Sequence, residues 1–461
     1  MPWLGRALAV VTVGMVLTTT TLALTDDSVP NDQSDLQPVV NAGGKEIKFD
    51  WPMIRIGTAE YKEGPTGVTV FRFERKVLAA FDVRGEPVTA NTELLRLGRD
   101  KPSVDAVVLS GGSSYGLEST TAVATAIKDD QLRTGTWGDI AHVTGAIIYD
   151  LGDRRLNEVY PDKKLAQAAF RAAKEGVFRV GSSGAGRFAK TGAFFGCNAH
   201  SGQGGAYYER GNLKIAAFTV VNALGVVTDR EGHIKAGYPD SNWPTNIVTA
   251  DLLKAVREKW DDGPAETKPT HNTTISLVVV NQKLSFGDLQ RLATQVHTSM
   301  ARGLQPYATE HDGDVLFAVS TGEVDLPQNE KERTMAIALI PAVASEVMWD
   351  AILSSVPEQP KQAQPVTVTA PLPVKYAGKY KFSRFVTVEI TAKNGKLFAQ
   401  ATGERDAYAI SREKPIALVP VSTSLDQFTI DPPSRYPLTL DFTTGTLVIN
   451  PGLWAQYGTK L

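Results

Sequence analysis

A segment rich in proline and glutamine, residues 357–373, divides the 461-residue chain into two parts with different patterns. Before it, groups of strand-length apolar runs are followed by groups of longer amphipathic or alanine-rich runs. This order predicts a layered α/β domain over residues 49–356 rather than a doubly wound sheet. After the segment, short alternating runs separated by turn signals predict a small, barrel-like all-β domain over residues 374–461. The segment itself has the composition of a linker.

The same patterns predict individual elements. In the C-terminal part, Asn394-Gly395 has the residues of a type I′ hairpin turn, in which both central residues need positive φ. In the N-terminal part we expect strands at 68–74, 76–83, 105–111, 214–225 and 275–281. We expect helices at 117–130, 163–176, 248–260, 286–304 and 333–356.

Composition excludes several classes of protein. The formal net charge is −2, so we expect no nucleic-acid-binding surface. The single cysteine, Cys197, cannot form an intrachain disulfide or a cysteine-based metal site. The six histidines have neither an HExxH motif nor another paired spacing. We therefore expect no metal and no cofactor.

The first 23 residues are typical of a secretion signal. Arg6 precedes the apolar run ALAVVTVGMVLTTTTLA, and Thr21 and Ala23 fit the small-residue rule for cleavage after Ala23. An uncleaved membrane anchor is the alternative, but the four consecutive threonines at residues 18–21 interrupt the run. Residues 24–48 are expected to form a flexible lead. The mature protein would then be periplasmic or secreted, with no membrane attachment after removal of the signal.

Ser114 is one candidate nucleophile. Residues 112–116, GSSYG, satisfy the G-x-S-x-G pattern, with a predicted strand before them and a predicted helix after them. The pattern is short, and no histidine in the sequence sits in a persuasive loop for a catalytic triad. A glycine-rich turn that lines a site without reacting explains the same residues.

Thr273 is a second candidate. The apolar run of residues 275–280 predicts a buried strand, yet Asn272, Thr273 and Thr274 stand directly before it. A cap or turn explains them simply. Alternatively, cleavage after Asn272 would give Thr273 a free α-amine, which titrates near pH ~8 and could accept the proton of its own hydroxyl.

Eight segments in one order resemble the P1 aminopeptidase family, which comprises L-aminopeptidase/D-esterase and the β-peptidyl aminopeptidases. The resemblance extends over about residues 50–355. The resemblance is specific because all eight segments occur in this order, whereas any single segment would not be specific. They are GPTGVTVFRF (64–73), AAFDVRGEPVTANTELLRLG (79–98), VDAVVLSGGSSYGLESTTAVATAI (104–127), GAIIYDLGD (145–153), VGSSGAGRFAKTGAF (180–194), AFTVVNALGVVTD (217–229), NTTISLVVVN (272–281) and HDGDVLFAVSTGE (311–323).

The resemblance implies an αββα sandwich of the N-terminal-nucleophile hydrolase type. It implies a precursor that cuts itself between Asn272 and Thr273 into chains of about residues 24–272 and 273–461. These chains would stay together and assemble into an oligomer. Thr273 would be the nucleophile of an exported aminopeptidase or amidohydrolase that acts on small peptides, amino-acid amides or esters.

The resemblance also implies roles for neighbouring residues. Asn222 matches an asparagine that donates to the developing oxyanion, and Tyr149 resembles a tyrosine beside it. Asp312 and Asp314 lie where some relatives have a serine and a glutamate that orient the nucleophile, and they could hold the α-ammonium of Thr273. A turn-forming asparagine, a rim tyrosine and a polar turn are the simpler explanations.

Other features bear on the substrate. Gly111, Gly112 and Ser113 are expected to line its pocket with backbone amides. Ile147 stands where some relatives have a glutamate that receives the substrate's amine, so classical aminopeptidase specificity stays open. The ornithine acetyltransferases share the fold, so acyl transfer to an amine is also open, with water as the default acceptor.

Two further hypotheses stay open from the sequence. One is an exported binding protein without catalytic activity on the same fold. Its C-terminal β domain, which resembles the tail of exported serine β-lactamase-like hydrolases, would then recognise a cell-wall or peptide ligand. The other is a serine hydrolase that uses Ser114.

Overall fold

The computed structural model describes residues 33–86, 88–96, 102–152, 154–196, 199–237, 247–258, 272–369, 372–434 and 436–461. The predicted signal peptide lies outside the described residues. Leu36–Leu461 form one compact unit, and all that follows concerns this unit.

Eleven strands form one hydrogen-bonded sheet that is folded into two layers. The longest strand, β4 (Thr66–Gly85), belongs to both halves of this sheet. Its first half pairs with β3 (Ile54–Tyr61) and β6 (Ser103–Ser110), and its second half pairs with β18 (Gly313–Val324). We predicted two strands here, at 68–74 and 76–83. The structure has one continuous strand, whose pairing with β6 is irregular between Arg72 and Val77.

The remaining strands of the assembly extend from β18 on one side and from β6 on the other. β18 is parallel to β16 (Thr273–Gln282), which pairs antiparallel with β13 (Leu213–Asn222), and β13 pairs with β12 (Gln203–Arg210). β6 is parallel to β7 (Val143–Ile147), which pairs with β5 (Thr89–Ala90). All ten residues of β16 are buried, because β16 has a strand on either side and side chains packed on both faces.

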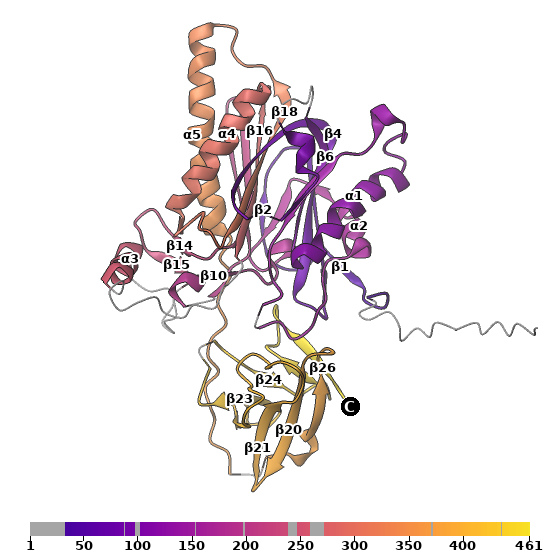
Figure 1. Ribbon diagram of the computed structural model, residues 1–461, viewed down its shortest axis with the longest axis vertical. Coiled ribbons are helices and arrows are strands. Elements are labelled where there is room, and N and C mark those ends of the chain that lie inside the picture. Colours follow the sequence, from indigo (N-terminus) through magenta and orange to yellow (C-terminus); the bar gives the residue numbers. More distant parts are fainter. Residues whose placement is uncertain are drawn as a thin grey trace, which may run out of the picture. The chain divides into compact units, whose positions relative to one another are not determined.

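Helices cover the two outer faces (Figure 1). α4 (Phe286–Ser299) and α5 (Glu330–Ser354) pack on the half that contains β16, and α1 (Glu118–Asp129) and α2 (Lys163–Arg171) pack on the half that contains β6. Between the halves lies an apolar core that includes Phe71, Phe218, Ile275, Leu277 and Phe317. The predicted αββα sandwich is therefore confirmed.

α5 has the length and mean hydropathy, 1.7, of a membrane-spanning helix, and it is the one described helix that does. A core helix can have the same composition. The buried residues of α5, Met348 and Ile352 among them, pack with those of α4 and the sheet.

Two predicted segments differ from the structure. Residues 38–48 are not a flexible lead, because β1 (Pro38–Val40) pairs with β3 and β2 (Lys45–Lys48) pairs with β9 (Val177–Val180). The predicted helix at 163–176 ends at Arg171, and Lys174–Glu175 form β8 beside β3. The other short elements are β10 (Lys190–Thr191), β11 (Ala199–His200), β14 (Val226–Thr228), β15 (Ile234–Ala236), α3 (Thr249–Glu258) and β17 (Leu304–Gln305).

The C-terminal strands form a closed barrel, which confirms the predicted all-β domain. Its hairpin turn at Asn394 (φ 52°) and Gly395 (φ 73°) has the expected positive φ at both positions. Aromatic side chains of Tyr376, Phe428 and Phe442 pack in its core. The strands are β19 (Gly378–Lys381), β20 (Thr387–Lys393), β21 (Lys396–Ala401), β22 (Ile416–Pro420), β23 (Gln427–Asp431), β24 (Leu440–Asp441), β25 (Leu447–Ile449) and β26 (Gln456–Lys460).

Candidate active site

The predicted site lies where three strand ends meet. Asn222, the last residue of β13, stands opposite Thr273, the first residue of β16. β18 begins at Gly313, and just before it Asp312 forms an isolated β-bridge with Asn272. Residues far apart in the sequence, from Asn222 to Gly313, are thus held on rigid, hydrogen-bonded strands, which position side chains more precisely than loops do.

The carbonyl group before Thr273 is fixed on several sides. Thr273 is 7% exposed, and its Oγ1 donates a hydrogen bond to the carbonyl oxygen of Asn272 at 2.6 Å. The backbone N–H of Gly313 donates to the same oxygen at 2.8 Å. The side-chain amide of Asn272 donates to the carbonyl of Asn222 at 3.0 Å. An attack by the hydroxyl on this carbonyl carbon would place negative charge on an oxygen that already has an N–H donor.

Asn222 is almost completely buried, at 1% exposure, and hydrogen bonds fix its side chain. Its Oδ1 accepts the backbone N–H of Lys190 at 3.0 Å, and its Nδ2 donates to the carbonyl of Tyr149 at 3.3 Å. An amide carries two N–H groups, and no second acceptor for Nδ2 occurs among the described residues. The remaining N–H of Asn222 can therefore donate to a reacting oxygen.

Lys190 is a candidate that the sequence reasoning missed. It is 7% exposed, and β10 brings it next to Asn222. A Cβ placed on Gly152 would lie 2.8 Å from Lys190 Nζ and 3.8 Å from Cε1 of Tyr149, so the ammonium and the ring both flank this glycine. Tyr149 donates its hydroxyl to the carbonyl of Leu151 at 3.4 Å. The only sequence signal for Lys190 was its presence in the segment at 180–194.

Asp314 is fully buried near Thr273. Its Oδ1 accepts the backbone N–H of Thr274 at 2.6 Å, and its Oδ2 accepts that of Ala308 at 3.2 Å. Burial, and then the charge of Asp312, hold the pKa of Asp314 well above its usual range. The carboxyl group of Asp314 is thus hydrogen-bonded to the residue that follows Thr273.

Asp312 is also buried, at 2% exposure. Its Oδ1 accepts the backbone N–H of Leu224 at 3.1 Å, and its Oδ2 accepts the hydroxyl of Thr309 at 2.8 Å. Burial raises the pKa of Asp312, although these hydrogen bonds oppose the shift. The predicted role of both aspartates, to hold the α-ammonium of Thr273, stays a prediction.

The structure corrects the predicted use of the glycine-rich turn. The backbone N–H of Gly111 donates to the carbonyl of Gly67 at 2.9 Å, and that of Ser113 donates to Ile148 at 3.0 Å. The N–H of Gly112 donates to the carboxylate of Asp150 at 2.8 Å. These amides are already used inside the protein, so the turn can form a wall of a site but cannot offer these three donors to a substrate.

Ser114 and Ile147 lie in different environments. Ser114 is exposed in the 3-10 turn after β6, and no histidine among the described residues is hydrogen-bonded to it. Ile147 is 3% exposed at the end of β7, opposite Ser110. An apolar, buried side chain thus occupies the place where an amine-binding glutamate was considered.

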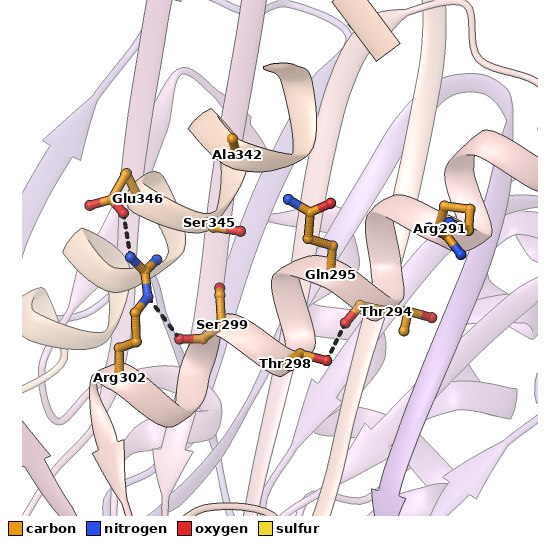
Figure 2. Close-up of a pocket in the computed structure, with 9 residues that line it drawn as sticks. All are labelled: Arg291, Thr294, Gln295, Thr298, Ser299, Arg302, Ala342, Ser345 and Glu346. Carbon is orange, nitrogen blue, oxygen red and sulfur yellow. Dashed lines mark hydrogen bonds and ion pairs between the residues drawn. The ribbon is translucent and has the colours of Figure 1, made fainter. Parts of the chain in front are cut away.

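Two other features lie away from this site. A hollow of about 700 Å³ lies between α4 and α5 and contains none of the predicted site residues (Figure 2). Its lining residues are Arg291, Thr294, Gln295, Thr298, Ser299, Arg302, Ala342, Ser345 and Glu346. Asp229, Glu231 and His233 are spaced closely enough to hold a metal ion, but Asp229 forms an ion pair with Lys235 at 2.9 Å and accepts backbone N–H groups of its own loop. We assign that cluster to loop structure.

Comparisons with known proteins identify relatives of this chain. A model of the family described as peptidase family S58 matches residues 49–367. A 6-aminohexanoate-oligomer endohydrolase of Agromyces sp. (strain KY5R) is 38% identical over 331 residues, which cover 70% of this chain and 90% of that protein. An uncharacterized aminopeptidase of Mycobacterium leprae (strain TN) is 32% identical over 307 residues, which cover 63% of this chain and 82% of that protein.

Among solved structures, the chain is similar to the L-aminopeptidase D-Ala-esterase/amidase from Ochrobactrum anthropi, which is described as a new variant among the Ntn hydrolase fold. The TM-score is 0.47 at 16% sequence identity, and the match covers 68% of this chain and 88% of that one.

Proposed function

The chain belongs to peptidase family S58, and from this membership we propose that it is a self-cleaving amidohydrolase whose nucleophile is Thr273. Membership in a peptidase family makes the protein a hydrolase and argues against the alternative of a binding protein without activity. The αββα fold argues against a serine hydrolase built on Ser114. The observation that carries the proposal is the 2.6 Å hydrogen bond between Thr273 Oγ1 and the carbonyl oxygen of Asn272.

In the first step, Thr273 Oγ1 attacks the carbonyl carbon of Asn272. The bond from that carbon to the nitrogen of Thr273 breaks, the nitrogen takes the hydroxyl proton, and an ester joins Asn272 to Oγ1. The N–H of Gly313 stabilises the charge on the carbonyl oxygen during the attack. Water then hydrolyses the ester and leaves a carboxyl group on Asn272 and a free amine and hydroxyl on Thr273.

In the second step, the same hydroxyl attacks an amide substrate. The free α-amine of Thr273 accepts the hydroxyl proton, since an N-terminal amine titrates near pH ~8 and is partly neutral at working pH. The unused N–H of Asn222 donates to the oxyanion. The amine of the substrate leaves with a proton, and water releases the acyl group from Oγ1.

We propose small peptides, amino-acid amides and esters as the substrate class, with unbranched amides of ω-amino acids as a second class. The second class is suggested by the 6-aminohexanoate-oligomer endohydrolase, which is 38% identical to this chain. It also agrees with Ile147, because an apolar side chain cannot pair with an α-ammonium group beside the scissile bond. Initial rates on alanine p-nitroanilide and on a linear 6-aminohexanoate trimer compare the two classes directly.

We also propose that the protein is exported by the signal in residues 1–23 and works as an oligomer of cleaved two-chain units. The apolar run after Arg6 supports export, and the pairing of β16 with β13 supports a two-chain unit that stays together after the cut. Fractionation of a host that expresses the full chain, followed by light scattering on the purified protein, tests both points.

The decisive variant removes one oxygen atom. Thr273→Val keeps the volume of the side chain, so the fold should persist while self-cleavage and hydrolysis both disappear. Thr219→Val is a matched control, because Thr219 is also buried in the same sheet and, among the described residues, its hydroxyl bonds to Ser276 alone. A Thr273→Val protein that is cut and active would refute the proposal.

A further inference from the structure

The barrel holds one short segment of the α/β domain through its backbone. Gln456, which is 1% exposed, accepts the N–H of Leu156 at 2.6 Å and donates to the carbonyl of Arg154 at 2.7 Å. Arg405 donates to the carbonyl of Arg155 at 3.2 Å. Three consecutive residues thus have backbone groups bonded to barrel side chains. The Gln456 bonds join residues about 300 positions apart in the sequence.

Side chains strengthen this contact. Leu156 is fully buried and belongs to the hydrophobic core of the barrel rather than to that of the sandwich. Glu158 forms an ion pair with Arg384 at 2.9 Å. A side chain buried in a neighbouring core is fixed by close packing, so the position of residues 154–158 depends on the barrel.

A buried ion pair connects residues 154–158 to the candidate active site. The guanidinium of Arg155 lies 3.6 Å from the carboxylate of Asp150, and both side chains are 0% exposed. Asp150 follows Tyr149, whose carbonyl accepts the amide of Asn222. A displacement of Arg155 would therefore move a partner of the proposed oxyanion donor.

A second route starts at Trp454 of the barrel. Its ring stacks on that of His200, with centroids 3.8 Å apart and planes at 11°. His200 pairs in register with Lys190 in the β10–β11 hairpin, and the N–H of Lys190 donates to Oδ1 of Asn222. The two residues that hydrogen-bond to the Asn222 side chain, Lys190 and Tyr149, are thus each connected through a few further residues to a contact with the barrel.

We propose that the C-terminal barrel is a working part of the active site: through Gln456 and Trp454 it positions the amide of Asn222 for oxyanion stabilisation. The inference rests on the proposed function of Asn222. Gln456 and Trp454 are positioning residues, because they act through other groups. A misplacement of about 1 Å can lower a rate on the order of 100-fold, so loss of either contact can slow the chemical step without touching the substrate.

The test uses the full chain after self-cleavage, with kcat and KM measured on one amide substrate. Gln456→Ala and Trp454→Ala should each lower kcat on the order of 10-fold to 100-fold and change KM less than about twofold, because an oxyanion donor acts mainly on the transition state. Gln427→Ala is the matched control, since Gln427 bonds to Asp441 within the barrel. It should leave kcat unchanged.

A double-mutant cycle separates positioning from general structural support. If the barrel acts through Asn222, Gln456→Ala should lower kcat less than about twofold in an Asn222→Ala background. An equal loss in both backgrounds would overturn the inference, as would a wild-type kcat in Gln456→Ala and Trp454→Ala. Trp454→Phe, which keeps a stacked ring, provides a milder variant if the alanine variants do not fold.

Failure of the proposed function is distinguishable from failure of this inference. If Thr273→Val is active, the proposed function is wrong. If wild-type protein is cut and active and the barrel variants keep its kcat, the proposed function stands and the positioning role is wrong.

Discussion

Replacement of Asn222 by alanine tests the oxyanion assignment quantitatively. Asn222 stands opposite Thr273 in the sheet, and its side chain has one N–H left for a reacting oxygen. Loss of one such donor lowers kcat by about 10²-fold to 10³-fold, or about 2.7–4 kcal/mol. KM should change little, because the donor interacts most strongly with charge that develops in the transition state.

The same substitution should also affect stability. Asn222→Ala removes the hydrogen bonds that its side chain makes with the N–H of Lys190 and the carbonyl of Tyr149. An unsatisfied buried polar group costs about 1–3 kcal/mol, so the free energy of unfolding should fall by a similar amount. Self-cleavage should be scored on denaturing gels, and kcat should be normalised to the fraction of chains that are cut.

Asn281 offers a control at the other end of the same sheet. It is 4% exposed, accepts the N–H of Lys214 at 2.9 Å and donates to the carbonyl of Asn212 at 2.8 Å. Asn281→Ala should therefore lose similar stability and keep its activity. An Asn222→Ala protein that is cut and has a kcat within about threefold of wild type would refute the assignment.

Three further predictions concern buried charge. The folded protein holds the pKa of Asp314 above its unfolded value, so the free energy of unfolding is highest at acidic pH and falls as pH rises through the folded-state pKa. Urea titrations at several pH values should show this fall. Asp314→Asn should make the fall smaller. Burial holds the pKa of His200 well below its usual value, so acidification below about pH 6.5 should lower stability by up to about 1.4 kcal/mol per pH unit. His200→Phe should weaken this dependence, and an unchanged slope would contradict it. Arg155→Met should destabilise by about 3–5 kcal/mol because it leaves Asp150 buried without its cation, and a change under about 1 kcal/mol would contradict this.

Periodicity in the sequence was enough to predict the layers of the sandwich and the barrel. The run at residues 275–280 is apolar at every position but one because β16 is buried on both faces, and such burial leaves a strong signal. The turn at Asn394-Gly395 was equally predictable, because few residues accept positive φ at both positions. Local sequence patterns were therefore sufficient to predict most of the fold.

Features that depend on distant partners were not predictable in this way. The sequences of β1 and β2 are short and have no strand pattern, and these residues form strands because they pair with the edges of β3 and β9. The sequence does not show that the backbone N–H groups of Gly111 and Gly112 already donate to Gly67 and Asp150 and so cannot bind a substrate. Lys190 and Gln456 have no local motif, since their roles arise from contacts made across the folded chain.

Self-cleavage is tested most directly by the state of the Asn272–Thr273 bond in the purified protein. Intact mass measurement with N-terminal sequencing of each species would determine it. We predict two chains, one of which begins Thr273-Thr274-Ile275. A single chain that is active and continuous through Thr273 would contradict the self-cleavage mechanism.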